Sequence, residues 1–147
     1  MTGKVEAVIF DLDGTVALHH NPDGSQRRGH FEYSKVSEDL PNIPVINIVQ
    51  ILSKIWQPIA VTGRMDENNV RTDTINWIYK QMSMSGFPLL MREDGDYGKD
   101  YIIKEEIYFR YVEPYYDIKL VLDDRNQVVD MWRRLGLTCF QVAAGDF

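Results

Sequence analysis

The sequence predicts an α/β fold in which a parallel β-sheet is covered by helices on both faces. Short apolar runs rich in β-branched residues alternate along the chain with longer segments of helical periodicity. This alternation is typical of strand–helix–strand units, whose strands pair in parallel. Polar residues also follow directly after several apolar runs, as expected where parallel strands end at a ligand-binding edge. The 147 residues suffice for one domain with its own core, and we expect that domain to span residues 1–147.

The first strand is predicted at Val5–Phe10, a run rich in β-branched and aromatic residues that a turn at Gly14 ends. Residues 19–42 are polar and contain an Asn-Pro-Asp-Gly turn signal, so we expect a long loop there with room for only a minimal cap. Pro44 is well placed to start a helix that runs to about Ile55. We expect the buried face of this helix to comprise Val45, Ile48, Val49, Leu52 and Ile55.

Two further strands are predicted at residues 58–61 and 88–91, because both are short apolar runs. A helix lies between them at about residues 68–82, and the side on which Trp77 lies is left open. The inward positions of this helix are predicted to be Val70, Ile75, Ile78 and Tyr79. After a loop rich in Asp, Gly and Lys, another helix is predicted at about residues 100–112.

The last third of the chain repeats the alternation. A fourth strand is predicted at residues 118–122, and a helix at about 126–135, where Gly136 occupies the usual position after a helix end. A fifth strand at residues 138–142 contains Cys139, the single cysteine of the chain. One cysteine excludes an internal disulfide, and its place in a strand favours a buried structural thiol over a nucleophile.

Charge and hydropathy limit the possible function classes. The formal net charge of −6 argues against a broad, nonspecific nucleic-acid binder but is compatible with a local grip on one end of a polynucleotide. No apolar stretch approaches the length of a membrane span, and the N-terminus lacks a signal-peptide pattern. We therefore expect no membrane partner and a cytoplasmic location.

Carboxylates gather after two of the predicted strands. Asp11 and Asp13 follow the first strand, and Asp123 and Asp124 follow the fourth. Because parallel strands end at the same edge of a sheet, we expect these groups to converge. Like charges at a buried edge are costly unless a cation binds between them. A divalent cation and phosphate chemistry explain the arrangement, whereas helix caps and turn acids are the alternative.

Hydroxyl and basic groups follow the other strands. Thr62, Gly63 and Arg64 come after the second predicted strand, where the hydroxyl can donate to phosphate and the arginine can pair with it. On the helix after the third strand, Asp100 and Lys104 stand four residues apart and therefore share a face. The alternatives are an Arg64 that pairs with a surface acid and a solvated Lys104.

These blocks resemble the four motifs of the haloacid dehalogenase superfamily of phosphatases. The blocks are Asp-Leu-Asp-Gly-Thr from Asp11, Val-Thr-Gly-Arg up to Arg64, the helical Lys104, and Leu-Asp-Asp up to Asp124. Residues 104–107, 122–134 and 141–147 are further similar to the C-terminal 3′-phosphatase domain of phage T4-type polynucleotide kinase-phosphatases. The resemblance covers nearly the whole chain and implies a Rossmann-like, haloacid dehalogenase-like sheet with a minimal cap.

The resemblance implies a role for each acid. Asp11 is the expected nucleophile, and Asp13 the expected acid and base toward the leaving oxygen and the attacking water. Lys104 balances the charge of Asp11 and of the phosphoryl oxygens, and Asp124 completes the catalytic set. The expected Mg²⁺ ligands are Asp11, the backbone carbonyl of Asp13, and Asp123 or Asp124, the choice between the last two being open.

The remaining site residues follow from the same resemblance. It implies a phosphate-binding group of Thr62, Gly63, Arg64 and Arg28, supported by Asp100, which orients Lys104. For Arg28 a solvated loop position, or replacement by Arg27, is an almost equal alternative. The three histidines have no metal-ligand spacing and are expected at the surface. The tyrosines between residues 108 and 116 are expected to pack, with base stacking by one of them as the alternative.

The resemblance implies a Mg²⁺-dependent phosphohydrolase that removes a 3′-phosphate from DNA or RNA ends through an aspartyl-phosphate, with a 2′,3′-cyclic phosphate as a further substrate. One alternative is a phosphatase of the same superfamily that acts on a nucleotide or sugar phosphate, and another is a binding module that keeps the fold. The chain contains no Gly-x-x-x-x-Gly-Lys-[Ser/Thr] loop. We therefore expect no kinase activity and a functional partnership with a separate kinase or ligase, in a bacterial or phage-infected cell.

Overall fold

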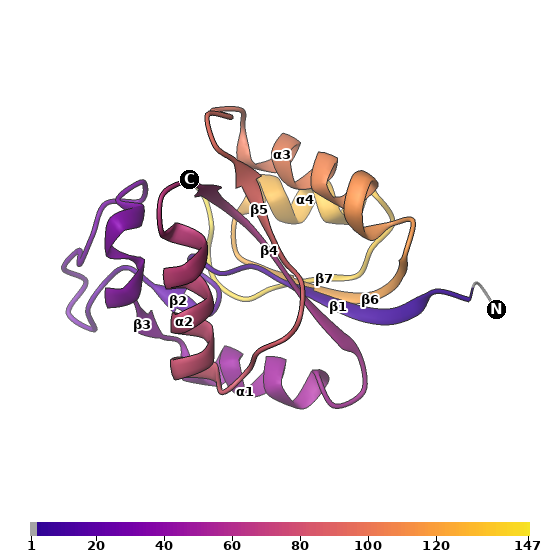
Figure 1. The fold of residues 1–147 in the computed structure, drawn as a ribbon, viewed down its shortest axis with the longest axis horizontal. Coiled ribbons are helices and arrows are strands. Elements are labelled where there is room, and N and C mark those ends of the chain that lie inside the picture. The colour runs from indigo at the N-terminus through magenta and orange to yellow at the C-terminus, as the bar shows by residue number, and fades with distance from the viewer. Residues whose placement is uncertain (1–2) are drawn as a thin grey trace.

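The computed structural model describes residues 3–147, which form a five-stranded parallel sheet with helices on both faces and confirm the predicted fold class (Figure 1). In the order in which they lie side by side, the strands are β5 (Leu89–Glu93), β4 (Gln57–Asp66), β1 (Val5–Phe10), β6 (Tyr116–Asp123) and β7 (Cys139–Gln141). Neighbouring strands pair in parallel throughout this sheet. All of them therefore end at the same edge of the sheet.

From Ala7 to Phe10 the central strand β1 is buried on both of its faces. Val8 and Phe10 lie in one hydrophobic core, whereas Ala7 and Ile9 lie in the other. Successive side chains of a strand point to opposite faces, so a strand that is covered on both sides needs an apolar residue at every position. This requirement explains the unbroken apolar run that leads to Asp11.

Two helices cover each face of the sheet, and each pair closes one of the two cores (Figure 1). The first face carries α1 (Ile43–Leu52) and α2 (Val70–Met82), and the second carries α3 (Asp100–Ile107) and α4 (Asn126–Arg134). The strand-to-helix alternation along the chain fits this arrangement, because each crossover helix packs back onto a parallel sheet.

The buried side of α2 differs from the predicted one, because Ile75 and Tyr79 are exposed and Trp77 is buried. The positions that α2 buries are Val70, Thr74, Trp77, Ile78 and Met82, which form one helical stripe. Thr74 belongs to this stripe because its hydroxyl accepts a hydrogen bond from the buried Arg64. The prediction counted only apolar residues as inward, so it missed the polar Thr74 and placed Ile75 on the buried face instead.

The first helix is shorter than predicted. It ends at Leu52, so Ile55 lies beyond it and is exposed. Ile48 is exposed as well, because Ile46 and Val49 hold the buried positions of α1. The predicted face for this helix was therefore wrong at Ile48 and Ile55.

The helix predicted at residues 100–112 is helical throughout but changes its hydrogen-bond pattern. After α3 the chain continues as a π-helical turn, η2 (Tyr108–Val112), in which the amide of Glu113 donates to the carbonyl of Tyr108 over 2.8 Å. No helix among residues 3–147 is both long and apolar enough to cross a membrane.

The segment between β1 and α1 forms a small cap at the carboxyl edge of the sheet (Figure 1). It was predicted as a loop, but it contains the short antiparallel pair β2 (Ala17–Leu18) and β3 (Leu40–Pro41) and the 3₁₀ helix η1 (Tyr33–Glu38). Val16 and Val36 are fully buried and anchor this segment in the core beside α1 and α2. The cap is therefore small, as predicted, but ordered by its own apolar residues.

The thiol of Cys139 is buried at the sheet edge strand β7, and burial raises its pKa to about 12. A thiol in this state is protonated near neutral pH and reacts slowly. We expect iodoacetamide to label the native protein far more slowly than the urea-unfolded protein, as measured by intact-mass spectrometry. Rapid stoichiometric labelling of the native protein would contradict a structural role for this cysteine.

Candidate active site

The first cluster of the site forms where β1 and β6 end. Asp11 follows β1 directly, Asp123 is the last residue of β6, and Lys104 reaches both from α3. The Lys104 Nζ lies 2.8 Å from Asp11 Oδ1 and 3.0 Å from Asp123 Oδ2. All three side chains are almost completely buried. The structure thus brings together residues that are up to 112 positions apart, as the common edge of a parallel sheet requires.

A third carboxylate, Asp124, belongs to the same cluster. The Thr15 hydroxyl lies 3.0 Å from Asp11 Oδ2 and 3.3 Å from Asp124 Oδ1 and therefore joins the two acids. Oxygen atoms of Asp11, Asp123 and Asp124 lie within 4.8 Å of one another. Three carboxylates beside the single ammonium of Lys104 leave two negative charges, which is the charge that one divalent cation would neutralise.

Burial and mutual repulsion shift the pKa values of the charged groups in this cluster. Burial, followed by the neighbouring carboxylate of Asp123, raises the pKa of Asp11 well above its usual range, although Lys104 works in the opposite direction. Burial and Asp123 also raise the pKa of Asp124. Burial alone would lower the pKa of Lys104, but Asp11 and Asp123 outweigh it and raise that pKa. The lysine therefore stays charged, and a bound cation would relieve the repulsion that remains.

The two neighbouring acids at the end of β6 differ in their surroundings. Asp123 Oδ1 accepts hydrogen bonds from the backbone amides of Asp124 and Arg125, and its Oδ2 accepts from Lys104 and from Trp132 Nε1. Protein donors therefore occupy both of its oxygens. Asp124, by contrast, lines the cavity above the cluster together with Asp11.

Gly14 permits the close approach of the loop after β1 to Asp124. Its φ is +82°, and a Cβ on this residue would lie only 2.1 Å from Asp124 Oδ2. A side chain at position 14 would thus collide with the carboxylate and also strain the backbone. Both the packing against Asp124 and the backbone conformation therefore require glycine at this position of the Asp-Leu-Asp-Gly-Thr block.

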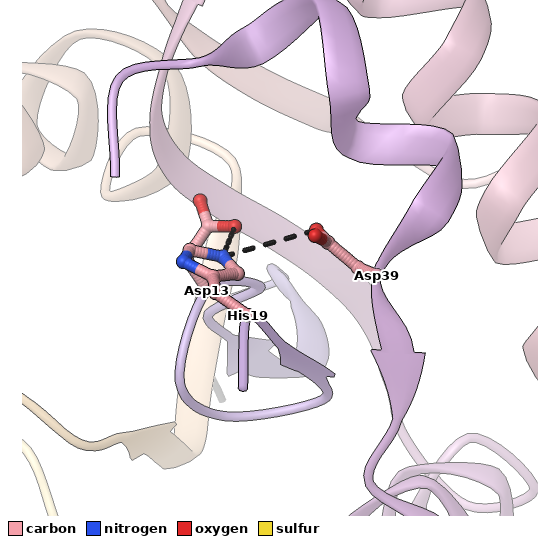
Figure 2. Close-up of side chains that lie close together, drawn as sticks. All are labelled: Asp13, His19 and Asp39. Atoms are coloured by element: carbon pink, nitrogen blue, oxygen red, sulfur yellow. Dashed lines mark hydrogen bonds and ion pairs between the residues drawn. The ribbon is translucent and has the colours of Figure 1, made fainter. Parts of the chain in front are cut away.

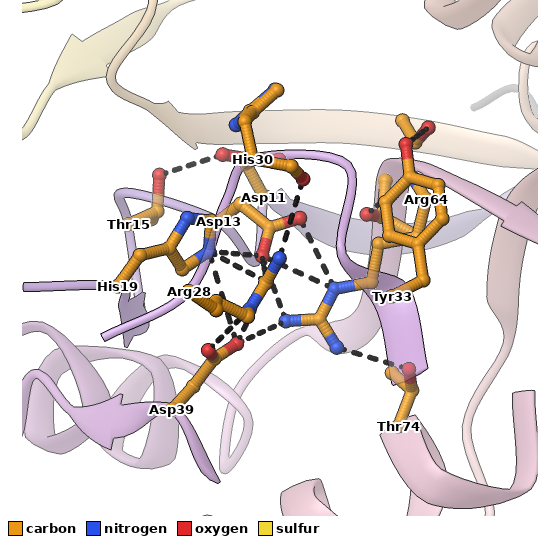
Figure 3. Close-up of polar contacts among 12 residues, drawn as sticks. Asp11, Asp13, Thr15, His19, Arg28, His30, Tyr33, Asp39, Arg64 and Thr74 are labelled. Atoms are coloured by element: carbon orange, nitrogen blue, oxygen red, sulfur yellow. Dashed lines mark hydrogen bonds and ion pairs between the residues drawn. The ribbon is translucent and has the colours of Figure 1, made fainter. Parts of the chain in front are cut away.

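The second cluster surrounds Asp13 and contains two buried arginines. Arg64 Nη2 lies 2.8 Å from Asp13 Oδ1, and Arg28 Nη2 lies 2.9 Å from the same oxygen. The close-up shows both guanidinium groups converging on Asp13 and on a further acid, Asp39 (Figure 3). Burial would raise the pKa of Asp13, but the Arg64 charge and the hydrogen bonds of His19 and Arg64 hold it well below its usual range. Asp13 is therefore an anion in this arrangement.

Asp39 is a central site residue that sequence reasoning missed. Its side chain is fully buried and accepts from Arg28 Nε over 2.6 Å and from Arg64 Nη2 over 2.9 Å. Its backbone carbonyl accepts from Trp77 Nε1 over 2.9 Å, which ties the cap to α2. Asp39 stands in the polar segment 19–42, where no periodicity or motif marks one acid over another. The sequence pointed to Asp39 only indirectly, because Arg28 and Arg64 would each require an acidic partner if they were buried.

His19 also belongs to the site, so the expectation of a surface position was wrong for this histidine. Its Nε2 lies 2.7 Å from Asp13 Oδ1 and 3.8 Å from Asp39 Oδ2 (Figure 2). These three side chains have the spacing of a metal site. The guanidinium groups of Arg28 and Arg64 already balance the two acids, however, and would repel a cation. The Asp11 cluster keeps an excess of negative charge, whereas the Asp13 cluster does not. The Asp11 cluster is therefore the better candidate for the metal site.

The predicted phosphate-binding residues lie in two different places. β4 runs to Asp66, four residues beyond the predicted loop start at position 62, so Thr62, Gly63 and Arg64 are part of a strand whose pairing with β5 shifts there. The Thr62 hydroxyl accepts from the Arg64 amide, and the Arg64 side chain is fully engaged with Asp13, Asp39 and Thr74. Gly63 lines the cavity of the first cluster.

Asp100 and its neighbours connect Gly63 to the lysine. Asp100 Oδ2 lies 3.8 Å from Lys104 Nζ, as expected for residues four apart on one helix. A Cβ on Gly63 would lie 2.1 Å from Asp100 Oδ1, so this glycine makes room for the acid. Arg92, which sequence reasoning missed, donates to the carbonyl of Gly63 over 2.8 Å and lies 3.6 Å from Asp100. Asp100 is thus well placed to orient Lys104.

A cavity of about 500 Å³ opens above the two clusters. Asp11, Asp13 and Asp124 are the acids of the two clusters that line it. The same cavity is lined by basic side chains and by aromatic rings from three separate loops, including Phe31, Tyr97 and Phe147. Its volume lies within the range of small-ligand sites, and its acids and bases are those needed for phosphoryl transfer.

Comparisons with known proteins agree with this geometry. The family described as "Polynucleotide kinase PNKP phosphatase domain" matches residues 5–147. A protein of Autographa californica nuclear polyhedrosis virus, described as "Putative bifunctional polynucleotide kinase/RNA ligase", is 34% identical over 138 residues, which are 92% of this chain and 19% of that protein. The chain therefore spans about a fifth of this relative.

Two solved structures resemble the whole chain. One is titled "Structure of Pnkp1/Rnl/Hen1 complex" and matches with a TM-score of 0.88 at 40% identity, covering 100% of this chain and 49% of the other. The second, "Structure of the Pnkp1/Rnl/Hen1 RNA repair complex", matches with a TM-score of 0.87 at 40% identity, covering 100% and 45%. The chain thus spans about half the length of these neighbours. Together with the family match, this shows that the chain belongs to the polynucleotide kinase PNKP phosphatase-domain family of haloacid dehalogenase-type enzymes.

Proposed function

We propose that the chain is a Mg²⁺-dependent phosphohydrolase that removes a 3′-phosphate from DNA or RNA ends through an aspartyl-phosphate intermediate. The observation that carries this proposal is the buried Asp11, held by Lys104 beside two further carboxylates at the end of a cavity. We also propose that residues 1–147 form one phosphatase domain, since the strands of the sheet run from Val5 to Gln141.

Asp11 is the nucleophile of the proposed reaction. Its Oδ1 is held by Lys104 and its Oδ2 by Thr15, so the carboxylate is fixed toward the cavity rather than free to rotate. A carboxylate oxygen attacks phosphorus, the bond from phosphorus to the sugar oxygen breaks, and water then hydrolyses the aspartyl-phosphate. Lys104 supports the attack because its charge lies beside the oxygens that become more negative.

The donor set of Asp11, Asp124 and the backbone carbonyl of Asp13 suits Mg²⁺, which prefers oxygen ligands. When bound there, Mg²⁺ supplies positive charge to the phosphate oxygens. We assign direct contact to Asp124 and a supporting role to Asp123, because Asp123 already accepts hydrogen bonds at both of its oxygens. The net charge of the cluster supports a divalent cation rather than a monovalent one.

Asp13 serves as the acid and base in this proposal. It must carry a proton to the leaving oxygen, whereas Arg28 and Arg64 hold it as an anion in the present arrangement. We propose that its carboxyl turns away from the arginines when substrate phosphate arrives and competes for their donors. The phosphate-binding role of Arg28, Arg64, Thr62 and Gly63 stays a prediction, and this exchange of partners is how the arginines would fulfil it.

The assignment of a polynucleotide 3′ end rests on the relatives. The viral relative is described as a polynucleotide kinase and RNA ligase, and one solved neighbour as an RNA repair complex. A ligase joins a 5′-phosphate, which a kinase supplies, to a free 3′-hydroxyl, which a 3′-phosphatase supplies. We therefore place RNA ends first among the substrates, with DNA ends and 2′,3′-cyclic phosphates after them, and we propose a kinase and a ligase as functional partners. The cytoplasmic location stays a prediction.

The direct test is phosphate release from an RNA oligonucleotide that carries a 3′-phosphate. We expect release that requires Mg²⁺ and is abolished by EDTA, because without the cation the Asp11 cluster keeps two negative charges that Lys104 does not balance and that repel the phosphate. A 5′-phosphorylated oligonucleotide and a 3′-mononucleotide are the comparison substrates. Equal or faster hydrolysis of the mononucleotide would favour the small-molecule alternative, and release without any divalent cation would contradict the metal assignment.

The charge balance around Asp39 gives a prediction about stability. Asp39→Asn leaves two buried guanidinium groups short of one negative charge, so we expect the free energy of unfolding to fall by about 3 kcal/mol. Urea denaturation measures the loss, and phosphate release should fall with it because both arginines lose their orientation. Asp130→Asn, on the exposed side of α4, is the matched control and should change stability by less than about 0.5 kcal/mol. Wild-type stability of the Asp39 variant would show that the network tolerates the missing charge.

A further inference from the structure

Three strongly exposed aromatic side chains gather at the mouth of the catalytic cavity. Phe31, Tyr97 and Phe147 line this cavity and are 75%, 85% and 57% exposed. They come from three separate places: the cap just before η1, the loop between β5 and α3, and the segment after β7. Large apolar rings that stay in water at the rim of one cavity indicate a ligand with an apolar face. We call these three residues the aromatic rim.

Other side chains hold part of the rim in place. The His30 ring packs edge-on against Phe31, with ring centroids 4.9 Å apart, and its centroid lies 6.4 Å from that of Phe147. The Arg125 guanidinium lies 5.2 Å from the centroid of the Phe147 ring. Phe31, His30 and Phe147 therefore form a connected wall rather than three independent side chains. A wall that is ordered before binding loses less entropy when a planar ligand packs on it.

Basic groups stand beside the aromatic rim. Lys99 is exposed, lines the cavity and has no ion pair among the contacts found in residues 3–147. Arg125 also lines the cavity and keeps 27% of its side-chain surface exposed. Alternation of aromatic and basic side chains is the arrangement by which proteins hold single-stranded nucleic acid, the rings stacking on bases and the cations attracting phosphates.

We propose that the aromatic rim binds the base of the terminal nucleotide, while Lys99 and Arg125 attract the next phosphate of the strand. This inference rests on the proposed function and names the part of the substrate that the cavity recognises. Since the chain carries a net charge of −6, general attraction to nucleic acid is weak, and base stacking would supply affinity at the one end where the phosphate must enter. The stacking groups are thus not the tyrosines at 108–116, none of which lines this cavity.

Two DNA substrates test the proposal, one with an ordinary 3′-terminal nucleotide 3′-phosphate and one whose terminal sugar is a tetrahydrofuran without a base. For the wild-type protein we expect kcat/KM to be about tenfold higher with the base present. Phe31→Ala and Tyr97→Ala should each remove about tenfold from kcat/KM on the base-bearing substrate and leave the abasic substrate unchanged. Phe31→Trp should restore the preference, and Phe31→Leu should not, because leucine keeps apolar bulk but has no ring.

Tyr115→Ala is the matched control, because this tyrosine is also exposed but lies at the amino end of β6, away from the cavity. It should leave both substrates unchanged. Equal wild-type rates on the two substrates, or equal losses on both in the rim variants, would overturn the stacking proposal while the 3′-phosphatase stands. Release from neither DNA substrate and from no RNA oligonucleotide with a 3′-phosphate, together with hydrolysis of a small phosphate ester, would overturn the proposed function and the stacking proposal with it.

A binding measurement separates stacking from turnover. In the Asp11→Asn protein, which should bind without hydrolysis, a terminal 2-aminopurine beside the 3′-phosphate should lose fluorescence when it stacks on the rim. The same loss should be absent in the double variant that also carries Phe31→Ala. Unchanged fluorescence of a bound oligonucleotide in the Asp11→Asn protein would show that the base lies elsewhere.

Discussion

Two uncompensated negative charges, buried where β1 and β6 end, set the requirements for the rest of this molecule. Asp11, Asp123 and Asp124 lie within 4.8 Å of one another, and Lys104 offers them a single positive charge. Burial makes this repulsion costly. The folded protein must therefore hold the acids firmly, and a bound cation would relieve the repulsion between them. The backbone amides after Asp123, the Trp132 indole and the Thr15 hydroxyl all serve to hold these acids.

The second cluster has the opposite character. Asp13 and Asp39 are balanced by Arg28 and Arg64, so this half of the site is neutral without any ion. It also fastens the cap to the sheet, because Arg64 comes from β4 and both Arg28 and Asp39 come from the cap (Figure 3). A small cap with two short strands would bury little apolar surface alone. The buried ion pairs therefore contribute to the position of the cap over the nucleophile, while the cavity beside it stays open to a bulky substrate end.

Sequence reasoning was reliable where a residue's place follows from a strand end or a helical repeat. Asp11, Asp123 and Lys104 converge because parallel strands share one edge and because Lys104 stands one turn after Asp100. It failed where position depends on the path of an irregular segment. Asp39 and His19 lie in residues 19–42, whose course over the sheet no periodicity encodes.

The face of α2 was misjudged for a related reason. Thr74 is buried only because Arg64 needs a partner there, and that partnership is visible in space but not along the sequence. The aromatic rim is likewise visible only in space, because its three members come from loops far apart in the chain. Tertiary contacts between segments without periodicity were thus the part of the site that could not be foreseen.

The proposed reaction depends above all on covalent chemistry at Asp11, and a rapid chemical quench tests that step directly. A 3′-phosphate-radiolabelled oligonucleotide is mixed with the protein and Mg²⁺, the reaction is stopped in acid within a fraction of one turnover, and labelled peptides are mapped by mass spectrometry. We predict transient label on the peptide that contains Asp11, and none in the Asp11→Asn protein. Full turnover without any labelled protein, or label on a different residue, would contradict Asp11 as the nucleophile.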